Sequence, residues 1–142
     1  MAERPATLVV RPEAAPTVAL LDHYLALNTS RTSKRLPGPA AEASDRTFRG
    51  AVANLTEKFD DFLIRGDRTE SHLVLGKVQS GKTAHLLAML AWAADKGLAG
   101  AVVFTGTTGS LNDQTLVRIQ EDLEGLASDR ARVLRVPTLG SR

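Results

Sequence analysis

The feature that most constrains this chain is the string GKVQSGKT at residues 76–83, which fits the pattern G-x-x-x-x-G-K-[ST] at every fixed position. The short apolar run SHLVL (residues 71–75) precedes it, and a long apolar stretch from Lys82 to Asp95 follows it. A strand, a glycine-rich loop and a helix in this order are the usual setting for a loop that wraps a phosphate group. The string therefore predicts a phosphate-binding loop between a strand and a helix.

The loop also predicts how a nucleotide is held. Glycines let consecutive backbone N–H groups turn inward around a phosphate, and the following helix presents its positive N-terminus to the same anion. Lys82 is expected to place its ammonium group on the β- and γ-phosphates, and the Thr83 hydroxyl to coordinate Mg²⁺. We therefore expect ATP and Mg²⁺ as cofactors, with Lys82 and Thr83 as the candidate catalytic residues. The full candidate cofactor-binding set is Gly76, Lys77, Val78, Gln79, Ser80, Gly81, Lys82 and Thr83.

The composition indicates a small single-domain protein and excludes several other classes. A chain of 142 residues that is 43% hydrophobic supports one modest core. A net charge of +2 is too small to indicate a polybasic nucleic-acid binder, and the absence of cysteine excludes disulfides and cysteine-ligated metal. The longest nearly apolar run, Leu86 to Ala94, is too short to span a bilayer. We expect a cytoplasmic protein without a membrane partner.

The part of the chain before the loop is predicted to consist of a leader and a helical segment. Residues 1–16 hold three of the six prolines and are expected to form a flexible leader. Apolar spacing predicts a helix over residues 17–27 and a second one from Ser44 to Arg65, ended by Gly66. Between them, residues 28–43 have the polar and proline-rich composition of a linker. Residues 17–66 are thus expected to form a helical N-terminal segment.

From residue 67 onwards the pattern alternates between strands and helices. Strands are expected at residues 71–75, 101–105 and 133–136, with helices at 82–95 and from 111 to about 127. Strand, helix and strand with short connections form the crossover unit of a parallel sheet. The sequence therefore predicts an α/β fold over residues 67–142, with a parallel sheet, flanking helices and a preceding helical segment.

The loop and its surroundings resemble one known family. The string VQSGKT at residues 78–83, followed by TGTT at 105–108 and DQT at 113–115, is similar to the Z-one domain endonucleases, whose core is a helicase-like ATPase. The resemblance covers residues 73–123 and implies a partial P-loop NTPase domain of the RecA-like kind. It also implies that Thr107, Thr108 and Gln114 contact the DNA backbone, where small hydroxyl and amide groups suit phosphate oxygens. By this analogy the whole protein acts in restriction or defence against foreign DNA.

One part of the expected machinery is missing from the sequence. A P-loop enzyme that hydrolyses ATP needs a second carboxylate, at the end of an apolar strand, to hold Mg²⁺. No acidic residue after Thr83 follows such a strand; they are Asp95, Asp113, Glu121, Asp122, Glu124 and Asp129. We therefore expect the chain to be the N-terminal piece of a longer ATPase, inactive in hydrolysis by itself. Two alternatives stay open: a small P-loop kinase or phosphotransferase, and a non-catalytic remnant that binds nucleotide.

Other chemistry-bearing residues favour structural roles. The histidines His23, His72 and His85 lack the spacing of metal ligands. Trp92 lies among apolar residues at helical spacing and is expected in the core. Arg31, Lys34 and Arg35 form a small basic cluster, for which a solvated loop is a better explanation than contact with DNA.

Overall fold

The computed structural model describes residues 6–10, 19–66, 81–98, 100–103, 109–124 and 131–134. This part of the chain is mostly helical. Its elements in chain order are β1 (Ala6–Val10), α1 (Leu20–Arg35), α2 (Gly38–Arg65), α3 (Lys82–Asp95), β2 (Gly100–Val103), α4 (Gly109–Ile119), the π-helical turn η1 (Gln120–Glu124) and β3 (Ala131–Leu134).

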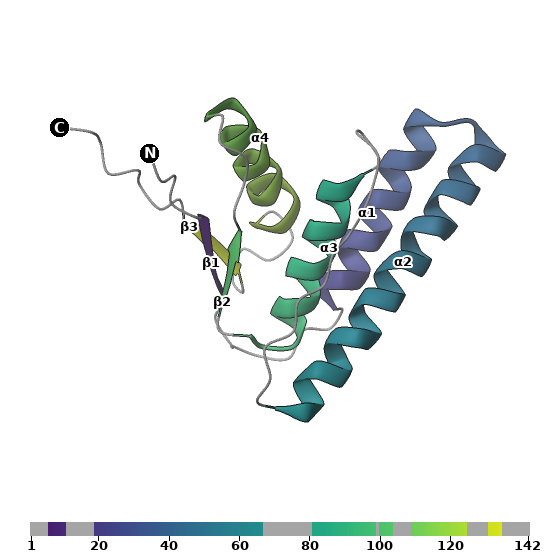
Figure 1. Cartoon of the computed structure of the whole chain (residues 1–142). Coiled ribbons are helices and arrows are strands. Elements are labelled where there is room, and N and C mark those ends of the chain that lie inside the picture. The colour runs from purple at the N-terminus through teal and green to yellow at the C-terminus, as the bar shows by residue number, and fades with distance from the viewer. Residues whose placement is uncertain are drawn as a thin grey trace.

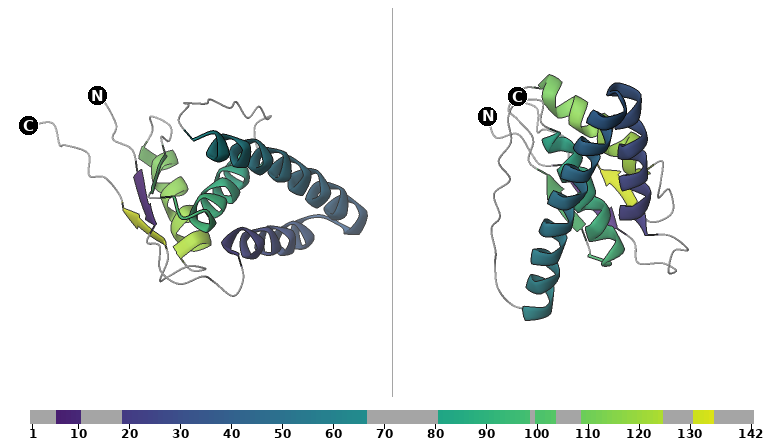
Figure 2. Two further views of the ribbon diagram at one scale, coloured as in Figure 1. Left: turned by 90° about the horizontal axis from the view of Figure 1, so that it is seen from below. Right: turned by 90° about the vertical axis from the view of Figure 1, so that its right-hand side faces the viewer.

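Helix α3 occupies the middle of the molecule (Figure 1). The antiparallel pair α1 and α2 packs on one side of it, and the strands lie on the other side, next to α4 (Figure 2). Contacts join α3 to α1, α2, β2 and η1. The helix that follows the predicted phosphate-binding loop is therefore held by both halves of the chain.

The prediction of a parallel sheet is wrong for the described residues. Strand β1 lies between β2 and β3 and pairs antiparallel with both, with Leu8 opposite Ala101 on one side and Val133 on the other. The expected parallel neighbour at residues 71–75 lies outside the described residues. The prolines of residues 1–16 favoured a flexible leader, so no strand was predicted there. Inside them, the run ATLVV is rich in the β-branched residues that favour strands.

The expected linker at residues 28–43 is also wrong, because most of it is helical. Helix α1 continues to Arg35 and α2 begins at Gly38, which leaves only Leu36 and Pro37 between them. Pro37 and Pro39 flank the start of α2, where a missing backbone N–H does no harm because the first N–H groups of a helix have no intrahelical partner. The prolines therefore mark a helix start rather than a long connection.

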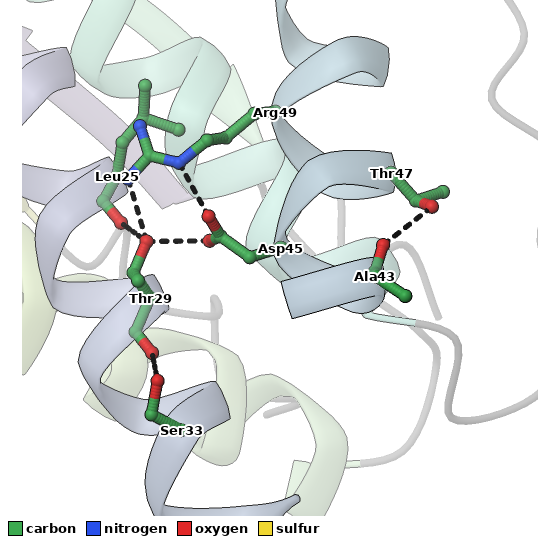
Figure 3. A network of polar contacts seen from close by, with 7 residues as sticks. All are labelled: Leu25, Thr29, Ser33, Ala43, Asp45, Thr47 and Arg49. Atoms are coloured by element: carbon green, nitrogen blue, oxygen red, sulfur yellow. Dashed lines mark hydrogen bonds and ion pairs between the residues drawn. The ribbon is translucent and has the colours of Figure 1, made fainter. Parts of the chain in front are cut away.

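A polar network keeps this stretch helical and ties α1 to α2 (Figure 3). The Thr29 hydroxyl lies 2.6 Å from Asp45 Oδ1 and 3.0 Å from the Leu25 carbonyl oxygen, and it accepts a hydrogen bond from Arg49 Nη2 at 2.7 Å. Arg49 Nε also donates to Asp45 Oδ2 at 2.8 Å. Since Ser and Thr have only modest helix propensity, these partners on α2 supply the stability that local sequence lacks.

The predicted limits of α2 and α3 at their glycine ends are confirmed. Helix α2 ends at Arg65, followed by Gly66 in the left-handed conformation (φ 84°), whose N–H donates to the Phe62 carbonyl. Helix α3 spans Lys82–Asp95 as predicted, between Gly81 and the left-handed Gly97. Positive φ is the conformation that glycine adopts without steric penalty, so these boundaries are encoded locally.

The core lies around α3. Its buried side chains come from four helices, the π turn and β2: Leu20, Tyr24, Phe48, Val52, Leu87, Ala88, Leu90, Ala91, Val103, Ile119 and Leu123. Trp92 is 5% exposed and donates from Nε1 to Asp60 Oδ1 at 3.2 Å, which confirms its predicted place in the core. Within the residues described, no helix has the length and apolar character needed to cross a membrane.

Candidate phosphate-binding site

The described part of the predicted loop is its end, where α3 begins. Gly81 is left-handed (φ 80°, ψ 21°), and the helix begins at the next residue, Lys82. The Gly81 carbonyl accepts the backbone N–H of Ala84 at 2.8 Å and that of His85 at 3.3 Å. No described atom lies within 4 Å of a Cβ built on Gly81, so the positive φ, rather than crowding, is what requires glycine here.

The structure places three of the predicted loop residues and leaves five undescribed. Gly81, Lys82 and Thr83 lie at the N-terminus of α3, where the first backbone N–H groups have no acceptor within the helix. The Lys82 side chain is exposed, and Thr83 is half-buried. The predicted contacts of Gly76, Lys77, Val78, Gln79 and Ser80 lie outside the described residues. The described end of the loop thus offers a positive helix terminus and one exposed lysine to an anion.

His85 is the residue at this site that sequence reasoning missed. Its Nδ1 lies 3.1 Å from the Gly81 carbonyl oxygen, and its ring meets the Phe48 ring of α2 edge-on, with centroids 4.8 Å apart. The spacing of the three histidines bears only on metal binding, which it does not favour. The signal that was available instead is the i, i+4 spacing between Gly81 and His85, which places the ring beside the last residue of the loop.

Asp95 serves the fold rather than a metal ion. Its two carboxylate oxygens accept the backbone N–H groups of Leu20 and Leu21, each at 2.8 Å. Those N–H groups belong to the first turn of α1, so a residue at the end of α3 caps the start of α1 across 75 positions in sequence. Asp95 also complements the positive end of the α1 dipole.

Asp122 is buried and forms an ion pair within the protein. It is 2% exposed, and its two oxygens accept hydrogen bonds from Arg31 Nη1 and Nη2, each at 2.6 Å. This bidentate pair joins η1 to α1, and the bond to Asp122 raises the pKa of Arg31. The pKa of the neighbouring Tyr24 is raised mainly by burial and further by the charge of Asp122, so the phenol stays neutral.

The hydrogen bonds of Asp95 and Asp122 bear on whether the described residues could bind a metal ion. Asp95, at the end of α3, and Asp122, in η1, accept hydrogen bonds from protein groups. Across the described ranges, no group of three or more His, Asp or Glu side chains is arranged to hold a metal ion. The Thr83 hydroxyl, at the N-terminus of α3, stays the predicted Mg²⁺ contact.

The residues expected near DNA are only partly placed. Thr107 and Thr108 lie outside the described residues, whereas Gln114 is exposed on α4. In the basic cluster, Arg31 is held by Asp122, while Lys34 and Arg35 are exposed in the last turn of α1. The cluster is therefore part of a helix rather than a solvated loop, and one of its three cations has a structural partner.

The observations that bear on function are therefore the sequence pattern at residues 76–83 and the start of α3 at Lys82. The resemblance to the Z-one family stays a prediction, because nothing else in the structure tests it. Comparisons of the chain with protein-family models, with curated proteins and with solved structures found no match.

Proposed function

We propose that this chain binds ATP with Mg²⁺ at the N-terminus of α3. The observation that carries the proposal is that α3 begins at Lys82, directly after the left-handed Gly81, within a string that fits the phosphate-binding pattern. Lys82 would contact the β- and γ-phosphates, Thr83 the metal ion, and the backbone from Val78 to Gly81 the phosphate oxygens. The proposal rests on the loop and its helix, since the sheet is not the parallel one expected beside them.

The wider role follows from the resemblance. We propose that the chain is the nucleotide-binding part of a helicase-like ATPase that acts on DNA, of the Z-one endonuclease kind. In that role Thr107, Thr108 and Gln114 would contact DNA phosphates, which position a strand without reading its sequence. The exposure of Gln114 on α4 is compatible with such a contact.

A second candidate function is nucleotide binding without hydrolysis. The observation that favours it is the occupation of two carboxylates after Thr83: Asp95 caps α1, and Asp122 is paired with Arg31. A carboxylate held in this way is not available to orient a metal-bound water. Binding and turnover should therefore be measured separately.

Titration of ATP into the protein, with and without Mg²⁺, tests the proposal. Lys82→Ala removes charge-assisted contacts to two phosphates, so we expect affinity to fall by about 100-fold or more. Thr83→Ala should leave metal-free affinity unchanged and remove the gain that Mg²⁺ provides. Lys58→Ala is the matched control, because Lys58 is an exposed lysine on α2. Equal affinity of the wild type and Lys82→Ala would refute the phosphate-binding assignment.

A further inference from the structure

His85 connects the predicted phosphate-binding loop to the helical hairpin formed by α1 and α2. One side of its ring faces the Gly81 carbonyl oxygen, 3.1 Å from Nδ1. The other contact is with Phe48, which is buried in α2 and meets the imidazole at an interplanar angle of 70°. An edge-on contact of this kind is a favoured arrangement of two aromatic rings. The imidazole thus bridges two segments that are far apart in sequence.

The contact between Nδ1 and the Gly81 carbonyl oxygen is a hydrogen bond when Nδ1 carries a hydrogen, because a carbonyl oxygen only accepts. We assign the hydrogen to Nδ1. The same oxygen already accepts the N–H groups of Ala84 and His85. Three donors therefore converge on the Gly81 carbonyl and hold it pointing into the first turn of α3.

The orientation of this carbonyl decides where the next N–H points. In a trans peptide the C=O and N–H bonds point in opposite directions, and the described chain contains no cis peptide bond. With the Gly81 carbonyl held toward the helix, the Lys82 N–H points away from it, toward the position a phosphate would take. The histidine hydrogen bond therefore acts on the peptide group that joins the loop to α3.

We infer that His85 is a positioning residue through which the α1–α2 hairpin sets the affinity of the phosphate-binding loop. The inference rests on the proposed function and adds to it a role for the helical segment that precedes the loop. His85 holds the Gly81–Lys82 peptide, and Phe48 holds the imidazole in place. A shift of α2 relative to α3 would loosen this peptide and weaken phosphate binding.

Three variants separate the hydrogen bond from the ring contact. His85→Phe keeps an aromatic ring against Phe48 but removes the donor, and we expect ATP affinity to fall about fivefold, the loss of one hydrogen bond. His85→Asn keeps an N–H donor as many bonds from the backbone as Nδ1 but loses the ring that meets Phe48, so affinity should fall about threefold. Phe48→Leu removes the ring that braces His85 and should lower affinity about threefold. Circular dichroism at the titration temperature establishes that each variant is folded.

The outcomes distinguish this inference from the proposed function. If Lys82→Ala weakens binding while His85→Phe does not, the coupling is wrong and the phosphate-binding site stands. If His85→Asn or Phe48→Leu binds like the wild type, the contact between the two rings does not affect binding and the coupling is again wrong. If Lys82→Ala binds like the wild type, the proposed function itself fails and the coupling fails with it.

A readout without nucleotide tests the hydrogen bond directly. The nitrogen chemical shifts of the imidazole, measured by NMR in the ligand-free protein, report which ring nitrogen carries the hydrogen. His85→Phe assigns these signals among those of His23 and His72, because it removes only one set. Hydrogen on Nδ1 at neutral pH supports the inference, and a ring with hydrogen on Nε2 alone overturns it.

Discussion

Removal of either partner of the Arg31–Asp122 pair should have unequal effects on stability. The Asp122 side chain is 3% exposed and that of Arg31 is 48% exposed. Without Arg31, the carboxylate stays buried and loses both of its 2.6 Å hydrogen bonds. Without the charge on Asp122, the guanidinium can still reach water. The change at Arg31 should therefore be the more harmful of the two.

The expected loss in the free energy of unfolding depends on how exposed the remaining partner of the pair is. Arg31→Met leaves a buried, uncompensated carboxylate, and the free energy of unfolding should fall by about 3 kcal/mol. Asp122→Asn keeps a hydrogen-bond acceptor beside a half-exposed guanidinium, so the loss should be about 1 kcal/mol. The double variant Arg31→Met with Asp122→Leu should lose less than Arg31→Met alone, because it buries no charge.

Urea unfolding followed by Trp92 fluorescence measures these differences, since Trp92 lies in the core. The matched control is Arg35→Met, an exposed arginine one turn further along α1, which should change stability by less than about 0.5 kcal/mol. A loss for Asp122→Asn greater than that for Arg31→Met would refute the reasoning. So would an Arg31→Met protein as stable as the control.

Two further predictions concern carboxylates that hold helices. Asp95→Ala leaves the first N–H groups of α1 without their cap, so unfolding free energy should drop by about 1.5 kcal/mol in thermal melts, against less than about 0.5 kcal/mol for the exposed Asp61→Ala. Burial tends to raise the pKa of Asp45, but hydrogen bonds from Thr29 and Arg49 outweigh it and hold the pKa below the ordinary value of an aspartate. The unfolded state then binds the proton first on acidification, so this contribution is present above the unfolded pKa and is lost as pH falls through the folded value. Asp45→Asn should therefore lose less stability than the wild type between pH 5 and pH 3 in urea titrations; parallel curves would contradict the assignment.

The sequence predicted well where a boundary depends on neighbouring residues. The start of α3 at Lys82 and the end of α2 at Arg65 follow from Gly81 and Gly66, which supply left-handed conformations within one residue of each helix. The helix over residues 82–95 was predicted for a similar reason, because a long apolar stretch is a property of one segment of the chain. The loop motif is also a local pattern, because its fixed positions are close together in the chain, and it stays a prediction.

Sequence reasoning failed where the partner of a segment lies far along the chain. Residues 28–35 have a linker-like composition, yet they are helical because Thr29 bonds with Asp45 and Arg49, and Arg31 with Asp122, which is 91 positions away. Local propensity does not contain these partners, and tertiary contacts override it. The contact between His85 and Phe48 of α2 is also distant in sequence, whereas the i, i+4 spacing of His85 from Gly81 is local.

The sequence by itself determined where the phosphate-binding pattern and the glycine-bounded helices lie, because these depend on backbone preferences and spacing within a few residues. Only the tertiary structure decided that Ala6–Val10 enters the sheet antiparallel between β2 and β3, and that Asp95 and Asp122 are used to hold α1. Strand pairing and buried ion pairs join residues distant in sequence, so their energies depend on which segments meet in the folded chain.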